Sequence, residues 1–142
     1  MAEKTLSAMQ KNDDDSVETL LASAWVNLAR GGEHAQEAVY TLQELIDKHG
    51  ASLLLLNALA AANMRLGNFV EADRVLIDAS SKGQNDPDTL VNMVACARHL
   101  QKPEELIARY ISQLSASAPN HEWVVARRNV DNAFDRAQAS LV

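Results

Sequence analysis

The stretch from Leu53 to Ala79 restricts the possible folds of this chain more than any other. It is interpreted as two helices joined by a tight turn at Gly67-Asn68. Small residues stand where two helices must approach closely, and large apolar residues stand between them. The small residues are Ala60, Ala72 and Ala79, and the large ones are Leu56, Leu59, Phe69 and Leu76. This pattern predicts a helical hairpin in which each helix buries one face.

The same pattern returns when the sequence is read in steps of about 34 residues. One step forward, Leu59 is matched by Met93. One step back, Leu59 is matched by Trp25 and Leu76 by Leu42. A helix-turn-helix unit of this period is typical of tetratricopeptide repeats, which stack side by side into a superhelix. We therefore predict an all-α fold, a right-handed α-solenoid of tetratricopeptide type.

The repeat starts divide the chain into a single solenoid of several units. Residues 15–52, 53–86 and 87–120 each form one repeat, and residues 1–14 form a linker and the second helix of a preceding, truncated repeat. Residues 121–142 are predicted to be a C-terminal capping helix, because repeat arrays need an end piece with a polar outer face. Its apolar stripe consists of Trp123, Val130, Phe134, Ala137 and Leu141.

Cap residues mark where the helices of this array begin. Asp15 with Glu18 is predicted to form a capping box for the first repeat. Asp86 followed by Pro87 is predicted to start the third, because aspartate caps well and proline suits a first helical position. These signals place helix starts about where the repeat predicts them.

Composition excludes several classes of protein. Hydrophobic residues make up 47% and charged residues 23% of the chain, which is typical of a folded globular protein. The formal net charge of -6 disfavours nucleic acid as a partner, because phosphates are repelled. No apolar run approaches the roughly 20 residues that span a bilayer, so no direct membrane insertion is expected, and no signal peptide is visible. Cys96 is the single cysteine, which excludes an internal disulfide and fits a reducing compartment.

No motif for catalysis or cofactor binding stands out. The acidic run from Asn12 to Asp15 lacks the glycine and the bidentate glutamate of a calcium loop. Cys96 and His99 lack an orienting carboxylate, so Cys96 is interpreted as a small buried residue. We predict a non-enzyme without cofactor or metal. An enzyme of helical fold is the rival class, and it would need a convergent polar pocket.

A solenoid of this type usually holds a peptide or protein segment on its concave surface, which the first helix of each repeat lines. Counting from the repeat starts predicts four concave positions in each unit. They are Leu20, Ser23, Asn27 and Arg30, then Leu54, Asn57, Ala61 and Met64, and then Asp88, Val91, Ala95 and Arg98. Leu54, Met64 and Val91 are apolar where the fold does not need burial, which favours an apolar partner element. Asn27 and Asn57 are predicted to fix the register of that element.

Some segments go beyond what a generic repeat requires. They include Ala24–Ala29 followed by Gly31-Gly32-Glu33, then Leu53–Asn57, and then Arg109-Tyr110-Ile111-Ser112-Gln113-Leu114. In these segments, and over nearly its whole length, the chain resembles the C-terminal half of the epsilon-subunit family of coatomer, the COPI vesicle coat. Gln101 departs from the family, which usually has glycine there, and that puts the conformation of this turn in doubt.

The resemblance implies a function that the residues alone do not give. Members of the family are non-catalytic tetratricopeptide subunits that bind and stabilise the C-terminal domain of the coatomer alpha subunit, and through it contact the other coatomer subunits. The coat serves retrograde Golgi-to-ER and intra-Golgi transport. This implies a cytoplasmic protein, peripheral on Golgi membranes and COPI-coated vesicles, with further repeats before the present sequence.

A different tetratricopeptide adaptor, such as a co-chaperone that grips an acidic peptide tail, is the alternative function. Such a carboxylate clamp uses several lysines and arginines in the groove. Only Arg30 and Arg98 qualify among the predicted concave positions.

Overall fold

The computed structural model describes residues 1–140, and in these residues it contains eight helices and no strand. The helices are α1 (Ala2–Asn12), α2 (Val17–Arg30), α3 (Glu33–His49), α4 (Leu53–Arg65), α5 (Phe69–Lys82), α6 (Pro87–His99), α7 (Glu104–Ser117) and α8 (Glu122–Ala139). The predicted all-α class is therefore confirmed. None of these helices is long and apolar enough to cross a bilayer.

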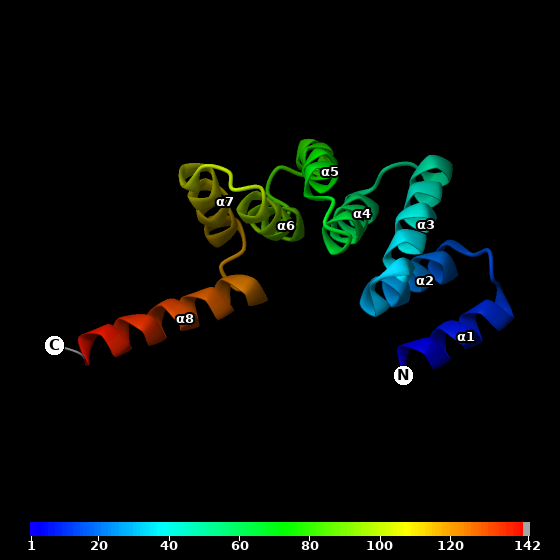
Figure 1. Ribbon diagram of the computed structural model, residues 1–142, viewed down its shortest axis with the longest axis horizontal. Coiled ribbons are helices and arrows are strands. Elements are labelled where there is room, and N and C mark those ends of the chain that lie inside the picture. The colour runs from blue at the N-terminus through cyan, green and yellow to red at the C-terminus, as the bar shows by residue number, and fades with distance from the viewer. Residues whose placement is uncertain (141–142) are drawn as a thin grey trace.

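The helices form an arch built from three helical hairpins, α2–α3, α4–α5 and α6–α7 (Figure 1). In Figure 1, α2, α4 and α6 line the inner side of the arch, while α3, α5 and α7 lie on the outer side. Helices α1 and α8 stand at the two ends. Each inner helix thus packs against its own partner and against a neighbouring hairpin, which is the stacking expected of a repeat array.

Each inner helix starts at a side-chain cap. The caps are Ser16, Ser52 and Asp86, and each accepts a hydrogen bond from the backbone N–H three residues later. The prediction of Asp15 as the first cap is wrong by one residue. Helix α2 begins at Val17, and the backbone N–H of Asp15 instead donates to the Asp13 carboxylate in the preceding loop. The Asp86 cap with Pro87 at the first helical position is confirmed.

The spacing of these caps shows that the step between repeats is not constant. Ser52 and Asp86 are 34 residues apart, but Ser16 and Ser52 are 36 apart. The outer helices keep the shorter step, because Ala38 and Leu42 match Ala72 and Leu76 in burial. The two extra residues therefore displace only the inner helix of the first repeat.

This displacement changes the role of Trp25. The step of 34 residues equated Trp25 with the buried Leu59, whereas the cap spacing equates Trp25 with Ala61 and Ser23 with Leu59. Trp25 is 49% exposed whereas Leu59 is buried, so the match of these two residues by the 34-residue step is wrong. The indole lines a cavity beside α1 and does not enter the seam between α2 and α3.

The core is deepest around the middle repeat. Helix α4 buries seven residues, and its neighbours contribute fully buried side chains such as Leu42, Leu45 and Leu76. Small residues at the crossings, including Ala60 and Ala72, have no exposed surface, as predicted for close helix contacts. Burial of this kind supplies most of the stability of a helical array, since short helices are marginal alone.

A polar bridge joins the second and third repeats. The Asn57 amide nitrogen donates to the Thr89 hydroxyl at 2.8 Å, and its amide oxygen accepts from the Asn92 side chain at 2.9 Å. Thr89 in turn donates to the Asp86 cap at 2.7 Å. The cap of α6 is therefore tied to the middle of α4, which fixes how the two repeats are stacked.

Helix α1 is only loosely attached. It contains no buried residue, and Leu6 and Met9 are half-buried against α2. A cavity of about 320 Å³, lined mainly by apolar side chains of α1 and α2, separates part of the two helices. The exposed ion pair between Glu3 and Arg30, at 2.7 Å, is the closest polar contact between α1 and α2.

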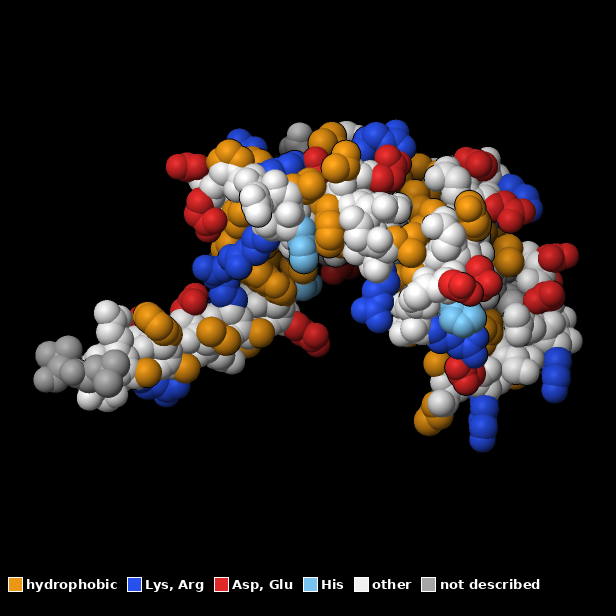
Figure 2. Space-filling model, viewed as in Figure 1, with side chains coloured by type: hydrophobic (Ala, Val, Ile, Leu, Met, Phe, Trp, Pro, Cys, Tyr) orange, Lys and Arg blue, Asp and Glu red, His pale blue; other side chains and the backbone are white. Residues whose placement is uncertain are grey.

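Helix α8 packs on the array only at its start. Trp123 and Val124 lie against Leu90 and Leu114 and close the end of the third repeat. Beyond that turn the helix projects away, so Val130 and Phe134 are each 67% exposed and Ala137 is exposed (Figures 1 and 2). The predicted stripe therefore covers the array at Trp123 alone, and Leu141 lies outside the described residues.

Candidate partner-binding groove

The inner side of the arch contains a groove formed where the three inner helices end. Figure 2 shows the hollow beneath the arch. The groove has a volume of about 720 Å³. Its lining comes from α2, α4 and α6 and from the start of α5. The lining residues are Leu28, Ala29, Ala61, Met64, Arg65, Phe69, Ala95 and His99. The wall is largely apolar, which suits a binding surface for a polypeptide segment.

Equivalent positions of successive repeats build this groove. The cap spacing equates Ala61 with Ala95, and these two small side chains leave space on the floor. It also equates Ala29, Arg65 and His99, which lie at the groove in the first, second and third repeats. The middle repeat is therefore the one that places an arginine there.

One wall of the groove is a stacked pair of rings. The rings of Phe69 and His99 lie 4.1 Å apart between centroids, at an interplanar angle of 11°. The Cys96 thiol donates to the Phe69 carbonyl at 3.1 Å, which holds the first residue of α5 against α6. Cys96 is fully buried, and burial raises the pKa of its thiol. Its interpretation as a small buried residue is confirmed.

Arg65 extends from the end of α4 across the turn after α2. A Cβ atom added to Gly31 would lie 3.1 Å from Arg65 Nη2, 3.3 Å from Nε and 3.6 Å from Cζ. Cζ is the farthest of the three atoms, so the Nε–Nη2 edge of the guanidinium is turned toward Gly31. Gly31 has φ of +72°, so glycine serves both the turn and this close approach.

Three of the twelve predicted site residues lie together at the groove, namely Ala61, Met64 and Ala95. Leu54 is 54% exposed at the opposite end of α4, and Val91 is half-buried against the cluster of Leu90 and Leu114. Asn57 is not available to a partner in the predicted way, because both ends of its amide bind the third repeat.

The remaining positions of the third repeat lie outside the groove lining. Arg98 is exposed one residue before His99. Asp88 is exposed at the start of α6, with its carboxylate 3.5 Å from the His121 ring.

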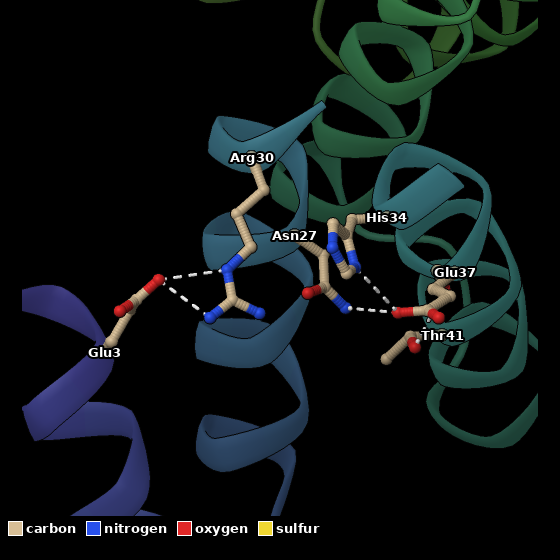
Figure 3. Close-up of polar contacts among 6 residues, drawn as sticks. All are labelled: Glu3, Asn27, Arg30, His34, Glu37 and Thr41. Carbon is tan, nitrogen blue, oxygen red and sulfur yellow. Dashed lines mark hydrogen bonds and ion pairs between the residues drawn. The ribbon is translucent and has the colours of Figure 1, made fainter. Parts of the chain in front are cut away.

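The four positions predicted in the first repeat do not face the groove. Asn27 points to α3 and donates to Glu37 at 3.3 Å, while Arg30 points to α1 and contacts Glu3 (Figure 3). Leu20 packs against the main core, and Ser23 is half-buried at the position equivalent to Leu59. The cause is the 36-residue step, since a shift of two residues rotates a helical position to nearly the opposite face.

Sequence reasoning missed five groove residues, and a signal for some of them was present. They are Leu28, Ala29, Arg65, Phe69 and His99. Counting from the caps Ser16 and Ser52 would have matched Leu28 with Met64, and Ala29 with Arg65. No periodicity signal indicates the stacking of Phe69 on His99, because the two residues belong to different repeats and their contact depends on how these repeats pack.

The groove lining contains one arginine and one histidine, and its other residues are apolar. Within residues 1–140, no three His, Cys, Asp or Glu side chains come together in a way that could hold a metal ion. The lowered pKa values belong to surface glutamates. A hydrogen bond and the charge of Arg30 lower the pKa of Glu3, and the hydrogen bond from Arg74 lowers that of Glu71.

Stacked helical hairpins with an apolar concave groove define this chain as a tetratricopeptide-like repeat protein. Sequence comparison gives the particular family. The sequence profile of the coatomer epsilon subunit matches residues 1–141, so the chain belongs to that family.

Named relatives agree with this assignment. Coatomer subunit epsilon-1 of Arabidopsis thaliana is 42% identical over 140 residues, which cover 99% of this chain and 47% of the relative. Coatomer subunit epsilon-1 of Oryza sativa subsp. japonica is 39% identical over 136 residues, covering 96% and 46%. Coatomer subunit epsilon of Dictyostelium discoideum is 32% identical over 136 residues, covering 95% and 45%. The chain thus spans about half the length of these relatives.

Proposed function

We propose that this chain is part of a non-catalytic structural subunit of the COPI coat, and that its concave groove binds the C-terminal domain of the coatomer alpha subunit. Family membership supports a role in coatomer. The observation that carries the binding site is the largely apolar groove formed jointly by the inner helices of three repeats. A segment laid in it contacts all three repeats at once.

The groove suggests how such a partner is held. Its floor is made of small residues, and Leu28, Met64 and Phe69 add apolar contact area. Burial of apolar surface contributes about 25 cal/mol per Å² before the entropy costs of association. Because this contribution does not depend on charge, the complex tolerates moderate salt.

The proposal includes a place in the cell. By way of the alpha subunit the chain contacts the other coatomer subunits, and it serves retrograde Golgi-to-ER and intra-Golgi transport. It is cytoplasmic and peripheral on Golgi membranes and COPI-coated vesicles.

The test measures binding of the full chain to the purified C-terminal domain of the alpha subunit by calorimetry. Met64→Asp is expected to weaken binding by about tenfold or more, because it places a charge in the apolar groove. Ile77→Asp is the matched control, since Ile77 is 58% exposed on the outer helix of the same repeat. Wild-type protein that does not bind overturns the proposal, and equal losses in both variants overturn the groove as its site.

A further inference from the structure

Arg65 is the one lining residue of the groove with a permanent charge. Acidic residues outnumber basic ones in the chain, 19 to 13, yet the lining contains no Asp or Glu. Within residues 1–140, Arg65 takes part in no side-chain hydrogen bond or ion pair, whereas Arg30 and Arg74 each contact a glutamate. The groove therefore has a positive charge without a carboxylate of its own chain beside it.

The Arg65 guanidinium lies against the turn after α2. Its Nε–Nη2 edge faces the buried Gly31, because a Cβ atom added there would lie nearer to Nη2 (3.1 Å) and Nε (3.3 Å) than to Cζ (3.6 Å). The Nη1 side points away from Gly31, and Arg65 is exposed, so the N–H groups on that side are open to a ligand. The Nη1 and Nη2 N–H groups at the open end match the two oxygens of a carboxylate.

The residues around Arg65 are mostly apolar, which favours a ligand with apolar groups on both sides of its charged group. On either side of Arg65 the equivalent positions are Ala29 and His99, and Met64 and the Phe69 ring complete the wall. A co-chaperone-type clamp would need several cations here. A single arginine between apolar contacts fits one carboxylate in an otherwise apolar segment.

We infer that the partner segment in this groove presents an aspartate or glutamate side chain, flanked by apolar residues, to the Arg65 guanidinium. The inference rests on the proposed function, because it specifies what the alpha-subunit domain inserts. Apolar burial holds the segment, and the ion pair sets its register. The wild-type affinity then has a modest salt-dependent part that belongs to Arg65.

The experiment titrates the full chain with the C-terminal domain of the alpha subunit at low and high salt. Arg65→Gln is expected to weaken binding about tenfold at low salt and to abolish the salt dependence. Arg65→Glu weakens it further, since two carboxylates then face each other. Arg109→Gln, which removes the same charge from exposed Arg109 on α7, leaves affinity unchanged. Circular dichroism melting confirms that each variant is folded.

A second arm identifies the partner's carboxylate. Exposed Asp and Glu residues of the alpha-subunit domain are changed one at a time to Asn or Gln. One of them is expected to reproduce the loss and to add nothing in combination with Arg65→Gln, as in a double-mutant cycle. If wild-type binding is intact but Arg65→Gln has no effect, or no acid couples to it, the inference is overturned and the proposed function stands. If the wild type does not bind, both are overturned.

Discussion

Helices α4 and α8 have similar apolar patterns in the sequence but differ in how much of each is buried in the structure. Each has apolar residues at helical spacing, yet α4 buries seven residues and α8 buries only Val124. The difference lies in their neighbours. Helix α4 packs against α3, α5 and α6, whereas α8 has the end of the third repeat beneath its first turn only. An apolar stripe shows that a face can be buried, and the adjacent elements decide whether it is.

The largest expected effect separates these two regions. Leu76→Ala removes a fully buried side chain and is expected to lower the free energy of unfolding by about 3 kcal/mol. Phe134→Ala removes a larger side chain that is 67% exposed, and a change within about 0.5 kcal/mol is expected. Urea unfolding followed by circular dichroism measures both. A large loss for Phe134→Ala would mean that the far part of α8 is covered in solution.

A smaller effect concerns the bridge between repeats. Asn57→Ala leaves the Asn92 amide and the Thr89 hydroxyl without their partner, and we expect a loss of about 2 kcal/mol. Asn27→Ala is the control, because its bond to Glu37 is exposed and 3.3 Å long, and it should change stability by less than about 0.5 kcal/mol. Equal losses in the two variants would contradict the role given to Asn57 in stacking.

The turns of the second and third repeats offer a reciprocal pair. Gly67 and Gln101 stand 34 residues apart, and both have positive φ, +80° and +53°. Glutamine adopts that conformation at a cost of about 1 kcal/mol, and glycine does so freely. Gln101→Gly is thus expected to stabilise the protein by up to about 1 kcal/mol, and Gly67→Gln to destabilise it by about as much. Thermal melting checks both signs, and the same sign for both variants would contradict this account.

The smallest effect is a pH dependence at the loosely attached end. The pKa of Glu3 lies below its usual 4.5 because of Arg30, so the ion pair contributes above that value and is lost as pH falls through the lowered pKa. The protection factors of α1 amides, which are exchange rates corrected for the intrinsic effect of pH, should therefore fall under acid while those of α4 are unaffected. Glu3→Gln should show the lower protection of α1 already at neutral pH. If the protection of α1 depends on pH in the same way in variant and wild type, the ion pair does not help to hold α1 on the array.

Much of the fold could be predicted, because local signals and long-range packing agree in the middle of the chain. Asp86 with Pro87 marked a helix start, and Ala72 and Leu76 marked a buried face. The groove was predicted in part, at Ala61, Met64 and Ala95. The prediction for the first repeat failed because a fixed period cannot detect two extra residues. The cap at Ser16 would have indicated them. The exposure of Phe134 had no local signal, since it depends on what lies beyond α7.

Cys96 gives the molecule an internal chemical reporter. It is the single cysteine, its thiol is fully buried, and burial raises its pKa, so the reactive thiolate is scarce in the closed state. A thiol reagent can therefore label Cys96 only after α6 separates from the start of α5, where the thiol donates a hydrogen bond to the Phe69 carbonyl. Phe69 also lines the groove. The labelling rate of native protein thus measures how often this wall of the groove opens.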